Sequence, residues 1–141
     1  MNKLSRTLRR NERGAAAMEF ALVAPALILL IIGIAQLGIL FMANAGLRNA
    51  VAEGARFATL DPRQAITPEE RTARIRNRIT SSRFGLDPAN MSTPTVTYGT
   101  SDSANYADIS ASYTVQLNFI FFSLSPITLT ESRRAFIYPS A

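Results

Sequence analysis

Residues 20–47 include no charged side chain, and this uncharged run limits the possible folds more than any other feature of the chain. As a helix at 1.5 Å per residue, the 24 residues 20–43 are about 36 Å long, which is enough to cross a hydrocarbon layer of about 30 Å. We therefore predict a membrane-spanning helix. Pro25 should bend it, and Gln36 places a polar amide at mid-membrane depth, where such groups typically bond to another helix.

Charges just before this run give the predicted helix a direction. Glu19 is a single carboxylate next to lipid, where an ionised group costs about 2.5–3.5 kcal/mol at the bilayer centre and less near the surface. The net charge of the chain is +5, and residues 1–14 contribute +4 of it. Positive charge before a span predicts a cytoplasmic N-terminus and an exported C-terminal part. Because the charge is confined to this tail, the composition argues against a nucleic-acid-binding domain.

Two simpler interpretations of the apolar run remain open. Ala43, Asn44 and Ala45 together resemble a signal-peptidase site, although the run is longer than the 7–15 apolar residues of a signal peptide. The other interpretation is a plain, uncleaved signal anchor.

Small residues recur every four positions beyond the apolar run, at Gly46, Ala50, Gly54 and Ala58. A strip of this kind allows two helix backbones to approach closely. We predict one continuous helix over residues 15–60, ended by the Asp-Pro pair that follows. The strip fits packing against the protein's own domain and packing against another subunit equally well.

Residues 61–141 are expected to form an exported α+β domain that begins with a helix. A Thr-Pro pair at residues 67–68, with Glu70 three positions after the threonine, is typical of a helix start. We predict a helix over residues 67–84, with Ile75 and Ile79 on its buried face.

Alternating residues predict a small antiparallel sheet in the rest of this domain. Apolar and polar side chains alternate over residues 109–119, which is typical of a half-buried strand. A short strand around Val96 and Tyr98 precedes it. After a turn expected at Ser125 and the proline that follows, residues 127–137 form a last strand with an exposed face or edge. The predicted fold is thus α+β, with a long transmembrane helix followed by one helix packed on a short antiparallel sheet.

The composition argues against an enzyme. The chain has no histidine and no cysteine, which removes the usual general base and both common nucleophile pairs. We find no glycine-rich phosphate loop and no spaced cluster of metal ligands, and we expect no catalytic residues, no cofactor, no metal and no small-molecule substrate.

Two segments closely resemble TadE-like proteins, which are minor pilins or pseudopilins of the tight-adherence (Tad, Flp, type IVb-like) pilus system. The first is RGAAAMEFALVAP at residues 13–25, and the second is NAVAEGARFA at residues 49–58. The resemblance implies that a prepilin peptidase cuts between Gly14 and Ala15. It also implies that Glu19 and Phe20 belong to the processing and assembly motif, with Glu19 as the fifth mature residue.

This resemblance implies a domain order and a set of partners. Residues 1–14 are a basic leader that is removed, residues 15–60 are the transmembrane and assembly helix, and residues 61–141 are the exported domain. The expected partners are the inner membrane, a prepilin peptidase, other pilins and the pilus assembly platform, with roles in adhesion, surface attachment and biofilm formation. Since major Flp pilins are much shorter, the added domain favours a minor component. The alternative is a periplasmic binding module on an uncleaved signal anchor.

Overall fold

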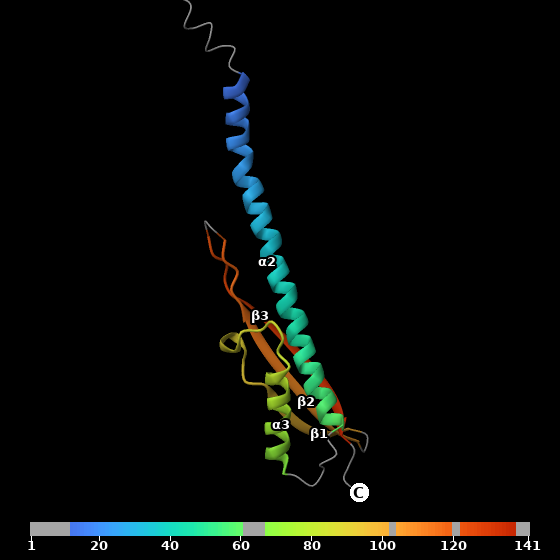
Figure 1. The fold of residues 1–141 in the computed structure, drawn as a ribbon. Coiled ribbons are helices and arrows are strands. Elements are labelled where there is room, and N and C mark those ends of the chain that lie inside the picture. The colour runs from blue at the N-terminus through green and yellow to red at the C-terminus, as the bar shows by residue number, and fades with distance from the viewer. Residues whose placement is uncertain (1–11, 61–66, 102–103, 120–121, 138–141) are drawn as a thin grey trace, which may run out of the picture. The chain divides into compact units, whose positions relative to one another are not determined.

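The computed structural model describes residues 12–60, 67–101, 104–119 and 122–137, with side chains described from residue 14 onward. The chain divides into two compact units, Met1–Leu37 and Gly38–Ala141, and each is described by itself. The elements are α2 (Glu12–Leu60), α3 (Pro68–Ser81), the short 3-10 helix η1 (Pro88–Asn90), β1 (Thr95–Ser101), β2 (Ala104–Val115) and β3 (Ile127–Ile137). This order confirms the predicted α+β fold, with a long apolar N-terminal helix, a second helix and an antiparallel sheet (Figure 1).

In the first unit, α2 is apolar on all sides. The described side chains of residues 14–37 are exposed or half-buried, and they include large ones such as Leu22, Leu30 and Ile34. A helix with apolar residues around its whole circumference is stable in lipid or in a large core. Among the described residues, α2 is the one helix that is long and apolar enough to cross a membrane. It ends at Leu60 as predicted, and the Asp-Pro pair expected to end it lies outside the described residues.

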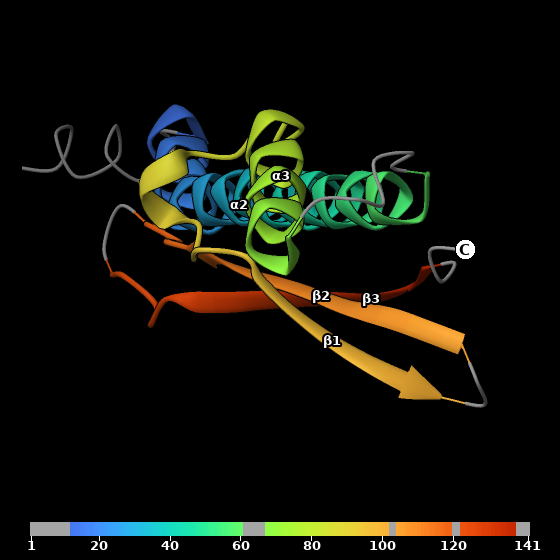
Figure 2. The same cartoon turned by 90° about the horizontal axis from the view of Figure 1, so that it is seen from below.

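The second unit is built around a core that α2, α3 and the sheet share. Figure 2 shows α3 and the second half of α2 on the same face of the sheet. The buried residues are Ala43, Leu47, Ala50, Val51, Ala55 and Ala58 from α2, Ile75 and Ile79 from α3, Leu86, Ala107, Ile109, Ala111, Tyr113, Val115 and Leu117 from β2 and its ends, and Ala135 and Ile137 from β3. The sheet is therefore covered by two helical segments, and not by the helix after residue 67 alone.

The sheet is an antiparallel meander in the order β1-β2-β3. From Ala107 to Val115 the odd-numbered side chains of β2 are buried under the helices, and the even-numbered ones lie half-buried on the open face. Ala107 pairs with Ala135 and Ala111 pairs with Glu131, so the odd-numbered residues of β3 face the helices as well. Strand β3 lies at the edge of the sheet, as we expected from its charged residues. One of these residues, Glu131, nevertheless lies on the covered face, where Arg48 pairs with it at 3.4 Å.

Beyond Val115 the alternation of buried and exposed residues continues, but the regular strand does not. Leu117 is buried, while Asn118 forms an isolated bridge with Ser123. The N–H of Phe119 donates to the carbonyl of Phe122 at 3.0 Å, so the chain has reversed by Phe122. The chain therefore reverses earlier than at Ser125, where we expected the turn.

Helix α3 begins as predicted and ends earlier. The Thr67 hydroxyl accepts a hydrogen bond from the N–H of Glu70 at 3.3 Å, and Pro68 occupies the first turn, where its missing N–H costs nothing. Both Ile75 and Ile79 are fully buried, as expected. The helix ends at Ser81 and not at residue 84, because the N–H of Ser82 bonds back to the last turn and Gly85 soon takes a left-handed φ of 73°.

Candidate functional site

The predicted processing motif lies on the exposed start of α2. Gly14, Ala15, Glu19 and Phe20 are all exposed. A methyl group added at Gly14 would meet no atom within 4 Å, and the helical backbone there does not require glycine. Because glycine inside a helix costs about 0.5–1 kcal/mol relative to alanine, this residue is not explained by the described fold.

Glu19 is the acid of this motif, and it has no ionic partner within the part of the chain whose side chains are described. Its neighbours on the helix, Met18 and Phe20, are apolar and exposed. A carboxylate among apolar side chains near lipid is stabilised mainly by a cation or a hydrogen-bond donor brought close to it. Such a partner would have to come from residues outside the described side chains or from another molecule.

The small-residue strip lies against the protein's own domain. A methyl group at Gly46 would come within 2.6 Å of the carbonyl oxygen of Phe84. At Gly54 it would collide with Cγ1 of Ile79 and come within 2.8 Å of Cδ1. Ala50 and Ala58 are buried in the same core. The sequence left open whether the strip packs on the protein's own domain or on another subunit. These contacts are packing on the domain, and a single chain does not test contacts with another subunit.

Two ion pairs that the sequence did not reveal hold α2 to the rest of the second unit. Glu53 accepts a hydrogen bond from Arg78 of α3 at 3.1 Å, and Glu131 of β3 pairs with Arg48. Arg78 and Arg48 are at least half exposed, so each pair contributes only about 0–1 kcal/mol. The pairs contribute mainly to orientation, since one joins α2 to α3 and the other joins α2 to β3. No local pattern predicts them, because the partners are far apart in the sequence.

On the open face of the sheet, one arginine organises a small polar cluster. Arg134 donates two hydrogen bonds to Asp108, each 2.8 Å long, and its guanidinium lies 3.9 Å from the ring centroid of Tyr106. The hydrogen bonds from Arg134 hold the pKa of the Asp108 carboxyl below its ordinary value. The Tyr106 ring lies over Gly99 of β1, where any side chain would collide with it. The cluster is partly exposed, and its carboxylate is already engaged by Arg134.

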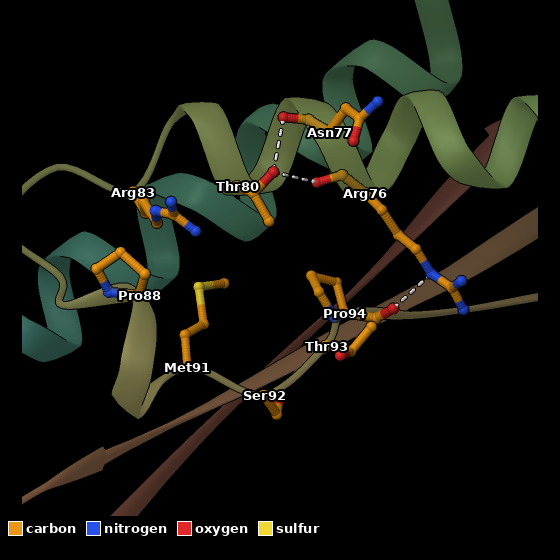
Figure 3. A pocket seen from close by; sticks show the side chains of 9 residues that line it. All are labelled: Arg76, Asn77, Thr80, Arg83, Pro88, Met91, Ser92, Thr93 and Pro94. Atoms are coloured by element: carbon orange, nitrogen blue, oxygen red, sulfur yellow. Dashed lines mark hydrogen bonds between the residues drawn. The ribbon is translucent and has the colours of Figure 1, made fainter.

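A shallow pocket of about 240 Å³ lies between α3 and the segment before β1 (Figure 3). Arg76 reaches across its end and donates to the carbonyl of Pro94 at 2.8 Å, while Thr80 bonds back to its own helix. Met91 and Pro88 supply apolar lining. Of its two arginines, Arg76 is already used to hold the loop, and among the described residues neither a carboxylate nor an imidazole stands beside the hydroxyl groups that line the pocket to activate them.

Comparison with known families bears on the long helix. Residues 14–56 match the family model described as TadE-like protein. Over these residues the chain is TadE-like. The matched segment begins at Gly14 and ends two residues after Gly54, so it includes the motif at the start of α2 and three of the four residues of the small-residue strip. No curated protein and no solved structure matches the chain.

The TadE-like segment supports a protein associated with the tight-adherence pilus, from a family of structural components and not of enzymes. The apolar helix fits a single-pass membrane anchor in that system. Among the described residues, no group of three or more acidic side chains is placed to hold a metal ion. The described residues thus offer a long apolar helix, able by length and composition to cross a membrane, that continues into the core of the second unit.

Proposed function

We propose that this protein is a minor pilin, or pseudopilin, of a tight-adherence pilus machine, which a prepilin peptidase processes between Gly14 and Ala15. Its role would be structural, in pilus biogenesis and through it in adhesion and surface attachment. The observation that carries the proposal is the TadE-like match over residues 14–56, which starts at the expected cleavage site.

The surroundings of Gly14 support processing there. The residue is exposed, lies on a helix with no packed neighbour, and is not required by the described fold. A peptidase that selects the residue before the cut by its small size would explain a glycine that the fold does not need. Removal of residues 1–14 would also remove four net positive charges that resist withdrawal of the helix from the membrane.

Cleavage would create a partner for Glu19. The new amine at Ala15 is a cation, and in low dielectric a cation a few ångströms from a carboxylate stabilises its charged form. We propose that the amine of one subunit neutralises Glu19 of a neighbour, with Phe20 in the same contact. The small residues from Gly46 to Ala58 then serve chiefly to fix the domain on α2, because the domain's own core already fills the space beside them.

The proposed location is the inner membrane, with the N-terminus in the cytoplasm and the second unit outside. The positive residues before the span support this orientation. The exported part would then include the second half of α2 together with residues 61–141, since Ala43 and Leu47 belong to the same core as the sheet.

The test is the mature N-terminus, measured by intact mass and terminal sequencing with and without the cognate prepilin peptidase. We expect a peptidase-dependent start at Ala15, blocked by Gly14→Val. Gly38→Val is the matched control, because both glycines lie in α2 and neither has an atom within 4 Å of an added Cβ. An intact Met1 in the presence of active peptidase would overturn the proposal, and a start near Gly46 would indicate an ordinary secreted protein.

An anchor exchange separates this proposal from a tethered binding module. Residues 1–37 are replaced by an unrelated uncleaved anchor, with the junction at Leu37 because the compact second unit begins at Gly38. A pilin should lose all function in pilus assembly, whereas a module that acts only through its domain should retain it.

A further inference from the structure

The end of the second unit nearest Gly38 exposes several large apolar side chains. Phe84 is 84% exposed, Phe122 is 50% exposed and Leu124 is 47% exposed. At the same end, Phe41 and Met42 of α2 are 67% and 52% exposed. Clusters of exposed aromatic and aliphatic residues usually mark a surface that contacts something apolar.

The hairpin that contributes two of these residues is ordered. Leu124 donates its N–H to the carbonyl of Leu117 at 3.3 Å, and Phe119 donates to Phe122. The rings of Phe119 and Phe122 stack with centroids 4.8 Å apart. Phe119 also packs against the core, so the hairpin holds Phe122 in place on its exposed side.

Contacts place this hairpin and Phe84 at the Gly38 end of the unit. The space beside Gly85 is bounded by Met42, and the N–H of Asp87 donates to the hydroxyl of Tyr113 at 3.2 Å. From Tyr113 the chain continues six residues to Phe119, about 20 Å at strand spacing. The eight residues from Gly46 back to Gly38 rise only about 12 Å.

The extended segment is therefore long enough to reach the Gly38 end of the unit. Figure 1 shows it continuing past the end of the sheet in that direction. Leu40 of α2 and Phe119 both pack against the core of the second unit.

The chemistry of this end matches lipid. Residues 116–130 include no charged side chain, although uncharged polar residues such as Gln116, Asn118 and Ser123 alternate with the apolar ones. Phe41 and Met42 also belong to residues 20–43, which are long enough to span a bilayer. Side chains that lie level with the end of a membrane helix share its surroundings, and aromatic residues there favour the boundary between lipid and water.

We propose that Phe84, Phe122 and Leu124, here called the apolar rim, insert into the outer leaflet beside the end of the membrane helix. The domain is then held at the membrane surface by a second, shallow contact, in addition to its anchor. This inference rests on α2 spanning the membrane and not on processing at Gly14.

Tryptophan reporters test the proposal, because the chain has no tryptophan of its own. The full-length Phe122→Trp and Phe84→Trp variants are reconstituted in phosphatidylcholine vesicles that carry some phosphatidylglycerol, with and without bromine on the upper acyl chain. Phe136→Trp is the matched control, since Phe136 is also about half exposed but pairs with Tyr106 at the other end of the sheet. Leu30→Trp reports insertion of the helix itself.

We expect brominated lipid to quench emission from the Phe122→Trp and Phe84→Trp variants and to leave Phe136→Trp unchanged. Equal quenching of Phe122→Trp and Phe136→Trp would overturn the proposal. So would blue-shifted emission from Phe122→Trp without quenching, because the rim would then be covered by protein and not by lipid. Leu30→Trp should be quenched in every case, and its failure would refute the membrane span, on which both proposals depend. A misprocessed N-terminus leaves these readouts unaffected.

Discussion

Replacing Gly54 by alanine tests whether the small-residue strip is required by the protein's own domain. The added methyl would overlap Cγ1 of Ile79 and approach Cδ1 to 2.8 Å. Ile79 is fully buried, and its branched β-carbon restricts it to few rotamers. The side chain therefore has little room to turn away, so α3 has to shift from α2.

The expected loss follows from two opposing effects. Overpacking a filled core by a small group typically costs about 1–3 kcal/mol. Alanine is the better helix former by about 1 kcal/mol, which offsets part of that cost. For Gly54→Ala we expect a net loss of about 1 kcal/mol in the free energy of unfolding, with an upper bound near 2 kcal/mol. For a domain of this size, each kcal/mol lowers Tm by about 4–8 °C.

The assay is thermal unfolding of the full chain in detergent, followed by near-ultraviolet circular dichroism of the tyrosines. Gly38→Ala is the matched control, because nothing lies within 4 Å of its added methyl, and we expect no loss of stability. Ile79→Ala alone should cost about 2–5 kcal/mol. Combined with Gly54→Ala it should cost less than the sum, by about 1 kcal/mol, since the collision is relieved. An unchanged Tm for Gly54→Ala, together with additive effects in the pair, would refute the packing of the strip on α3.

Three further predictions concern single groups. The pKa of Asp108, measured by carbon NMR titration, should lie below its ordinary value and should rise in the Arg134→Gln variant. Because folding lowers this pKa, the stability that the pair contributes is fully present above the ordinary carboxyl pKa. It is lost as the pH falls through the folded pKa. Tyr113→Phe removes the hydroxyl that accepts from the N–H of Asp87, and should cost about 0.5–1.5 kcal/mol in thermal unfolding. Thr67→Ala removes the cap of α3, and should cost about 1 kcal/mol and increase hydrogen exchange in its first turn, with no effect expected on the sheet.

Local patterns predicted the elements of the fold well. The uncharged run, the Thr-Pro pair before α3 and the strict alternation in β2 each depend on residues close in sequence, where periodicity and capping chemistry act directly. The errors were at the ends. Helix α3 stops at Ser81, where Ser82 bonds back to the last turn, and β2 stops at Val115, before the bonds that join residues 117–119 to residues 122–124. Helical and strand periodicity do not indicate where such bonds will form.

Contacts between distant segments were beyond prediction from the sequence. The spacing of Gly46 and Gly54 fits any closely packed helix, and only the structure shows that Ile79 fills the space beside Gly54. The charge of Glu131 fits an exposed edge, whereas here Arg48 compensates it on the covered face. Gly14 and Glu19 were selected from the sequence alone. Their predicted roles depend on other molecules, so the contacts of these residues within the chain do not test those roles.

The core of the second unit has a consequence for the order of events during biogenesis. It joins Ala43 and Leu47 to Ala135 and Ile137, which lie far later in the chain and are therefore made after them. Contacts across so many residues form slowly, and until they form the apolar face of α2 lacks its cover. The chain has no cysteine, so no disulfide holds a partly folded form together meanwhile. Closure of this core therefore has to wait until β3 has been made. In the interval before closure, the chain is most vulnerable to proteases and most dependent on chaperones.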